Sequence, residues 1–94
     1  MPTLFTRIIQ GEIPAEIVYQ DEHVVAFRDI QPVAPIHVLI VPRTEIEGLA
    51  TLPETGDHLR ILNAAKIIAE QLGLGNGYRL VINQGEDGGQ TVPH

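Results

Sequence analysis

The stretch IVYQDEHVVAFRDIQPVAPIHVLIV, residues 17–41, decides the fold. Two runs rich in β-branched and aromatic residues, 17–19 and 24–27, flank the polar segment 21–23, and this pattern is typical of a β-hairpin. The run 36–41 is continuously apolar and follows two prolines, so it predicts a third strand that is buried on both faces. Strands joined by connections this short predict an antiparallel meander.

Helical patterns lie on both sides of this stretch. Thr3 can cap a short helix whose apolar residues share one face, and Gly11 can end it. Apolar residues recur at helical spacing over residues 55–72, which predicts a long helix that ends at Gly73. After a glycine turn, residues 78–83 predict a fourth strand. The fold class is therefore expected to be α+β, with an antiparallel sheet, a short N-terminal helix and one long helix.

Length and composition limit the kind of protein. The chain has 94 residues, 44% of them hydrophobic and 19% charged, so we expect a single folded domain over residues 1–94. A domain this small buries a modest fraction of its surface, and a second subunit can cover an apolar face, so a homodimer is expected. The net charge of −6 and the absence of any Lys or Arg run disfavour nucleic acid and anionic membranes as partners.

Several classes of site are disfavoured by residue usage. Cysteine and serine are absent, which excludes thiolate zinc sites and cysteine or serine nucleophiles. The four histidines have no paired local spacing, so no metal site is expected. No signal peptide or long apolar segment is recognisable, and the default expectation is a cytoplasmic protein.

Two regions could bind an anion or a sugar. The glycine-rich segment 83–91 can offer backbone N–H groups, amides and a hydroxyl to an anion, although a plain connecting loop has the same composition. Asp29 follows a predicted strand, where its carboxylate could accept from both ribose hydroxyls while Ile30 supports a base; alternatively it is an exposed turn residue paired with Arg28. His37 enters an apolar strand, so it is either a satisfied core residue or a residue facing a polar site.

An ordered set of motifs spans the chain from Thr3 to His94. Its members are Leu4-Phe5 with Ile8-Ile9, Glu12 to Ala15, Phe27 to Ile30, Pro32 to His37, Gly77 to Arg79, and Asn83 to His94. Together these motifs closely resemble the histidine triad (HIT) family, and specifically its Hint branch. The resemblance implies a HIT-like fold in which the chain stops at the first histidine of the triad, so that the final strand is missing and the domain is C-terminally incomplete.

The resemblance also implies an activity and a set of site residues. The family hydrolyses purine nucleoside 5′-phosphoramidates or related nucleoside phosphate esters through a nucleotidyl-histidine, as a homodimer, without a metal or other cofactor. The implied nucleotide-binding residues are Phe5, Ile8 and Ile30 around the base, Asp29 at the ribose, and Asn83, Gly89, Gln90 and Thr91 at the phosphate, together with Phe27. His94 would be the first triad histidine, which orients the nucleophile, and His37 a supporting histidine.

The main departure from the family concerns the nucleophile. It would lie two residues after His94, so the 94-residue form is expected to hydrolyse phosphoramidates at a negligible rate. Two alternatives stay open: a dinucleoside polyphosphate hydrolase of a neighbouring branch, and a non-catalytic dimer that binds nucleotides or acts as a scaffold.

Overall fold

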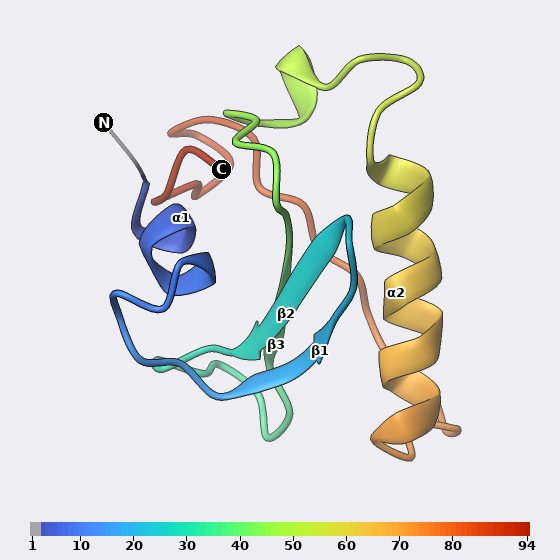
Figure 1. Ribbon diagram of the computed structural model, residues 1–94. Helices are drawn as coiled ribbons and strands as arrows, with labels where there is room; N and C mark the ends of the chain where they lie inside the picture. Colours follow the sequence, from blue (N-terminus) through green and yellow to red (C-terminus); the bar gives the residue numbers. More distant parts are fainter. Residues whose placement is uncertain (1–2) are drawn as a thin grey trace.

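The structure, a computed structural model, describes residues 3–94. In chain order, its elements are α1 (Leu4–Ile9), β1 (Ile17–Gln20), β2 (Val24–Arg28), β3 (Val38–Pro42), the 3₁₀ turn η1 (Leu49–Thr51) and α2 (His58–Gln71). Figure 1 shows a small twisted sheet between the two helices, with α1 on one side and α2 on the other. This arrangement confirms the predicted α+β class.

The sheet is the predicted antiparallel meander, with strand order β1-β2-β3. The register of its second pair runs from Val24 opposite Pro42 to Arg28 opposite Val38. Because β2 is paired on both edges and covered on both faces, its residues 24–27 are at most 2% exposed. The edge strand β3 is half-buried over residues 38–40, so the predicted burial on both faces is wrong for that part.

Side chains of β2 alternate between the two helices, as strand geometry requires. The face toward α2, here called the α2 face, holds the cluster of Val24, Ala26, Ala64 and Ile68. The face toward α1, here called the α1 face, holds Val25, Phe27 and Val41, against which Phe5, Ile8 and Ile9 of α1 pack. The sheet therefore has two separate apolar clusters, one on each face.

Local signals placed the helices correctly. The Thr3 side chain caps α1 by accepting from the backbone N–H of Thr6 at 3.1 Å, as predicted. Gly11 follows with φ of +80°, a conformation that favours glycine. The long helix α2 lies within the predicted range 55–72. Within residues 3–94, neither helix has the length and apolar character needed to cross a bilayer.

The predicted fourth strand is wrong for this structure. Residues 78–83 form no strand, and the side chains of Leu80, Val81 and Ile82 are 52–70% exposed. Among residues 3–94, β3 pairs with β2 but with no strand on its outer edge. An apolar segment needs such a neighbour to satisfy its backbone groups in a sheet, so local sequence preference alone did not make this one a strand.

Candidate functional site

Two polar residues emerge together at one end of the α1 face. Asp29 lies two positions after the buried Phe27, and His37 lies two positions before Leu39, so alternation places both on the α1 face. The backbone N–H of Asp29 donates to the carbonyl of His37 at 3.0 Å and joins the two chain segments beyond the paired strands. The fold therefore brings a carboxylate and an imidazole side by side.

The Asp29 carboxylate is held by two neighbours. Oδ1 accepts from the backbone N–H of Gln31 at 2.9 Å, and Oδ2 lies 3.5 Å from Nε2 of His37. The side chain of Asp29 is 22% exposed, and Arg28 pairs with Glu16 instead. Of the two interpretations of Asp29, the exposed turn residue paired with Arg28 is thus wrong, and a half-buried acceptor on the α1 face is what the structure contains.

The same geometry decides between the two interpretations of His37. Its Nδ1 accepts from the backbone N–H of Val33 at 3.2 Å, and its Nε2 faces Asp29. The side chain is 27% exposed and belongs to neither apolar cluster. His37 is therefore half-buried between a backbone donor and a carboxylate, outside the apolar core, and a role in a site stays a prediction.

Aromatic residues form an apolar wall in the middle of the α1 face. The rings of Phe5 and Phe27 are 5.5 Å apart in an edge-to-face arrangement, and Ile8 packs against the same cluster. Ile30 lies apart from this wall and is 86% exposed. Of the three residues predicted around a base, Phe5 and Ile8 are thus brought together against Phe27, whereas Ile30 is not part of the packed group.

His94 lies on the α1 face at the other end of β3. Its Nε2 is 2.8 Å from the carbonyl oxygen of Pro42, its Nδ1 is 2.8 Å from Oγ1 of Thr3, and its ring is 5.9 Å from that of Phe5. A carbonyl oxygen accepts only, so Nε2 carries the proton and Nδ1 accepts from the Thr3 hydroxyl. Pro42 is five residues from His37 along the chain, so the Cα atoms of these two residues are about 16 Å apart.

The glycine-rich loop closes on itself. The backbone N–H groups of Gly89 and Gln90 donate to carbonyls within the loop, and the side-chain oxygen of Gln90 accepts from the N–H of Gly85 at 2.8 Å. Asn83 and Thr91 are exposed. Contact between these residues and a phosphate stays a prediction.

Some contacts that support the site were not anticipated from the sequence. The Thr3 hydroxyl was assigned a capping role, yet it also contacts His94, which is 91 positions away. The Gln84 side chain accepts from the backbone N–H of Ala50 at 2.7 Å and joins the glycine-rich loop to η1. No short-range sequence pattern encodes such contacts, because they join residues that only the folded chain brings together.

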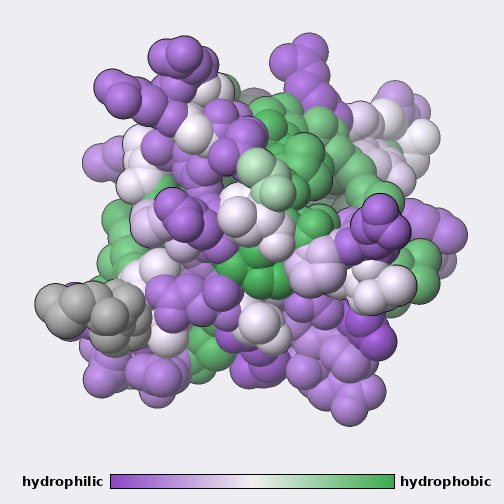
Figure 2. Space-filling view, turned by 90° about the horizontal axis from the view of Figure 1, so that it is seen from above, coloured by the Kyte–Doolittle hydropathy of each residue, from purple (hydrophilic) through white to green (hydrophobic). Residues whose placement is uncertain are grey.

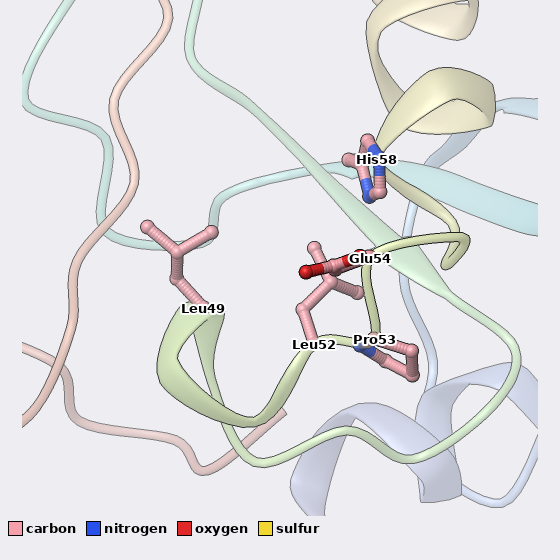
Figure 3. A pocket seen from close by; sticks show the side chains of 5 residues that line it. All are labelled: Leu49, Leu52, Pro53, Glu54 and His58. Atoms are coloured by element: carbon pink, nitrogen blue, oxygen red, sulfur yellow. The ribbon is translucent and has the colours of Figure 1, made fainter.

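A shallow pocket lies away from these residues. It is lined by Leu49, Leu52, Pro53, Glu54 and His58, between η1 and the start of α2 (Figure 3). Figure 2 shows the molecule from above relative to Figure 1, and apolar residues reach the surface there between hydrophilic residues. None of the predicted site residues lines this pocket, so it is separate from the candidate site.

No group of three histidine, aspartate or glutamate side chains within residues 3–94 is arranged to hold a metal ion. A metal-free reaction stays a prediction. In the β1–β2 turn, backbone N–H donation from His23 holds the pKa of Asp21 below its usual value. The hydrogen bond to Asp21 raises the pKa of Tyr19.

Comparisons with known proteins agree with this architecture. The model of the HIT domain matches residues 10–94. The chain is 50% identical to the 14 kDa zinc-binding protein of Zea mays, covering 99% of this chain and 76% of that protein. It is 44% identical to adenylylsulfatase HINT1 of Arabidopsis thaliana, covering 99% of this chain and 66% of that protein.

A solved structure extends the likeness to three dimensions. The HIT family hydrolase from Clostridium thermocellum superimposes with a TM-score of 0.93 at 43% identity, covering 98% of this chain and 83% of that chain. Both the sequence and the arrangement of helices and strands are thus shared with known members. The chain belongs to the HIT, or histidine triad, family.

Proposed function

We propose that the α1 face binds a purine nucleoside monophosphate and that a form of the protein with the complete histidine triad acts on purine nucleoside 5′-phosphoramidates or related phosphate esters. The observation that carries this proposal is the half-buried Asp29 carboxylate beside the wall of Phe5 and Phe27. Structural relatives include a histidine triad nucleotide-binding protein from Candida albicans, 34% identical over 99% of this chain.

The chemistry of the residues fits such a ligand. A carboxylate accepts hydrogen bonds from two adjacent hydroxyls, which is the arrangement that a ribose presents. The partly buried Phe5, whose ring packs edge-to-face against the buried Phe27, can offer aromatic surface to a planar base. The exposed Asn83 amide and Thr91 hydroxyl of the glycine-rich loop can present neutral donors to phosphoryl oxygens, so a chain of net charge −6 can bind an anion without a lysine cluster.

In the proposed reaction, a histidine nitrogen forms a bond to the α-phosphorus while the bond to the leaving group breaks. Water then attacks phosphorus and releases the histidine. By the resemblance, the attacking histidine lies two positions after His94 and is not among the 94 residues. His94 would orient it, and the contacts of its ring with Pro42 and Thr3 supply the rigidity that this role requires.

Binding tests the proposal directly on this chain. We expect Asp29→Ala to weaken adenosine monophosphate binding by roughly 10- to 100-fold in calorimetry, because two charge-assisted hydrogen bonds are lost. Glu70→Gln, on the exposed side of α2, removes a carboxylate elsewhere and is the matched control. Unchanged affinity in Asp29→Ala would remove this residue from the site, and no binding by the wild type would reject a nucleotide site.

We also infer a homodimer that covers the exposed apolar surface of α2 and the following segment. Large apolar side chains are exposed on both, namely Leu59, Leu62, Ile67, Tyr78, Leu80, Val81 and Ile82. Sedimentation equilibrium should give twice the 10.3 kDa chain mass. Ile82→Arg should shift the protein toward the monomer, whereas Val33→Arg, on the exposed loop after β2, should not. A wild-type monomer at all concentrations would contradict the inference.

A further inference from the structure

His37 connects the Asp29 carboxylate to the tip of the loop between β2 and β3. We propose that His37 is a positioning residue that fixes the orientation of Asp29 and thereby determines the preference for ribose over deoxyribose. This inference rests on the proposed function, because it concerns the sugar that Asp29 would bind. It adds a specificity role for a residue that does not itself need to touch the nucleotide.

The tautomer of His37 follows from its contacts. A backbone N–H can only donate, so the bond from Val33 requires a lone pair on Nδ1. In the neutral ring the proton is therefore on Nε2, the atom that lies 3.5 Å from Oδ2 of Asp29. This distance is long for a hydrogen bond, so the contact acts as an electrostatic attraction that points the N–H toward the carboxylate.

Asp29 is consequently held at both oxygens from different directions. The N–H of Gln31 donates to Oδ1, and the His37 ring faces Oδ2. Residues 30–36 are exposed, so few packing contacts hold this loop, and the bond from Val33 to His37 ties its tip to the start of β3. One imidazole thus restrains both the carboxylate and the loop that carries the Gln31 donor.

Orientation matters because a ribose is recognised through two hydroxyls at once. A carboxylate whose plane is fixed can accept from both, whereas a freely rotating one loses entropy on binding and favours one contact. The 2′-hydroxyl contact should therefore weaken when His37 no longer faces Oδ2. The expected signature is a smaller difference in affinity between adenosine monophosphate and 2′-deoxyadenosine monophosphate.

Two substitutions separate the two contacts of the ring. Asn places its side-chain oxygen near the position of Nδ1, so His37→Asn keeps an acceptor for Val33 and loses the group that faces Asp29. Gln places its amide nitrogen near the position of Nε2, so His37→Gln keeps a donor for Asp29 and loses the acceptor for Val33. His23→Gln, in the β1–β2 turn, is the control for removal of a histidine elsewhere.

The measurement is the ratio of the two dissociation constants, by calorimetry on each variant. The wild type and His23→Gln should prefer the ribonucleotide by roughly tenfold, as expected for loss of a hydrogen bond to a charged group. His37→Asn should lose most of this preference, and His37→Gln should retain it. An equal preference in His37→Asn and the wild type overturns the proposal, as does a loss of preference in His37→Gln that matches the loss in His37→Asn.

A second readout uses the wild type alone and does not depend on the folding of any variant. Nitrogen-15 chemical shifts of the His37 ring should report the Nε2–H tautomer at neutral pH, and the Nδ1–H tautomer would overturn the proposal. Different outcomes would reject the proposed function and the positioning role of His37. A wild type that binds no adenosine monophosphate rejects the proposed function, whereas a wild type that prefers ribose, together with an unchanged His37→Asn, rejects the positioning role alone.

Discussion

The two faces of the sheet are covered by helices of different length. The 14-residue α2 extends about 21 Å at 1.5 Å per residue, whereas the six-residue α1 extends about 9 Å. The five residues of β2 extend about 16 Å. A helix of the first length is longer than the strand, whereas a helix of the second length is shorter than the strand.

The chemistry of each face follows from this difference. The buried residues of the α2 face are aliphatic, and they are sealed between helix and sheet. The α1 face has an aromatic centre, and polar residues stand at its two ends: Asp29 and His37 at one, His94 at the other. Polar groups can keep their hydration or meet a ligand where the covering helix stops, so the incomplete cover makes a site possible on this face.

The largest expected effect belongs to the α2 face. Ile68→Ala should lower the free energy of unfolding by roughly 2 to 4 kcal/mol, because it leaves a cavity in a sealed cluster. Ile67→Ala is the matched control, since Ile67 is 41% exposed and Ile68 is 4% exposed. Chemical denaturation measures the change. Adenosine monophosphate affinity should be unaltered while the protein is folded, and a parallel loss of affinity would break the separation between the faces.

A change on the α1 face should instead weaken nucleotide binding and have little effect on stability. Phe5→Leu keeps an apolar side chain against Phe27, so the expected loss of stability is below about 1.5 kcal/mol. Nucleotide affinity should fall several-fold because the aromatic edge is lost. Leu4→Ala, at the exposed neighbouring position, is the control. Calorimetry and denaturation on the same samples would show whether affinity and stability respond separately; a stability loss above that of Ile68→Ala would contradict the comparison.

The cap of α1 should have an intermediate effect. Thr3→Ala removes the acceptor for the N–H of Thr6 and should cost about 1 kcal/mol of stability. It also removes the hydroxyl that meets Nδ1 of His94, so the ring signals of His94 should shift in NMR spectra. Thr3→Ser retains both contacts and should resemble the wild type. Equal stability of Thr3→Ala and Thr3→Ser would show that the short helix does not depend on its cap.

The smallest effect should come from the β1–β2 turn, which belongs to neither face. The N–H groups of His23 and Val24 donate to Oδ1 of Asp21, and donation from His23 is the main cause of its lowered pKa. The ionised carboxylate therefore stabilises the fold above its ordinary pKa, and this contribution disappears as pH falls through the lower folded value. Asp21→Asn should cost less than about 1 kcal/mol at neutral pH, because its oxygen can still accept.

The pH dependence of stability tests the role of the Asp21 carboxylate in the same variant. From neutral pH to below about pH 4, the free energy of unfolding should change less for Asp21→Asn than for the wild type. Nucleotide affinity should be equal in both proteins at neutral pH. A wild-type stability that does not decline in acid more than that of Asp21→Asn would contradict the role given to the carboxylate.

Much of the fold could be predicted because its signals are local. The alternating runs of the hairpin, the Thr3 cap and the helical spacing of residues 55–72 each act within a few positions of the chain. The site was predictable in part. Asp29 lies two residues after Phe27, so alternation places it on the same face of the sheet. The choice between a paired turn residue and an acceptor depended on the position of His37 in the folded chain.

The sequence by itself determined which segments prefer a helix or a strand and which residues carry chemistry, because backbone preference and side-chain type are properties of short stretches. Tertiary structure decided whether each apolar segment became buried or remained exposed. Residues 24–27 and 80–82 are all apolar, yet the first are buried and the second are exposed. The difference is that β2 has paired strands on both edges and a helix on each face, and burial requires neighbours that distant parts of the chain must supply.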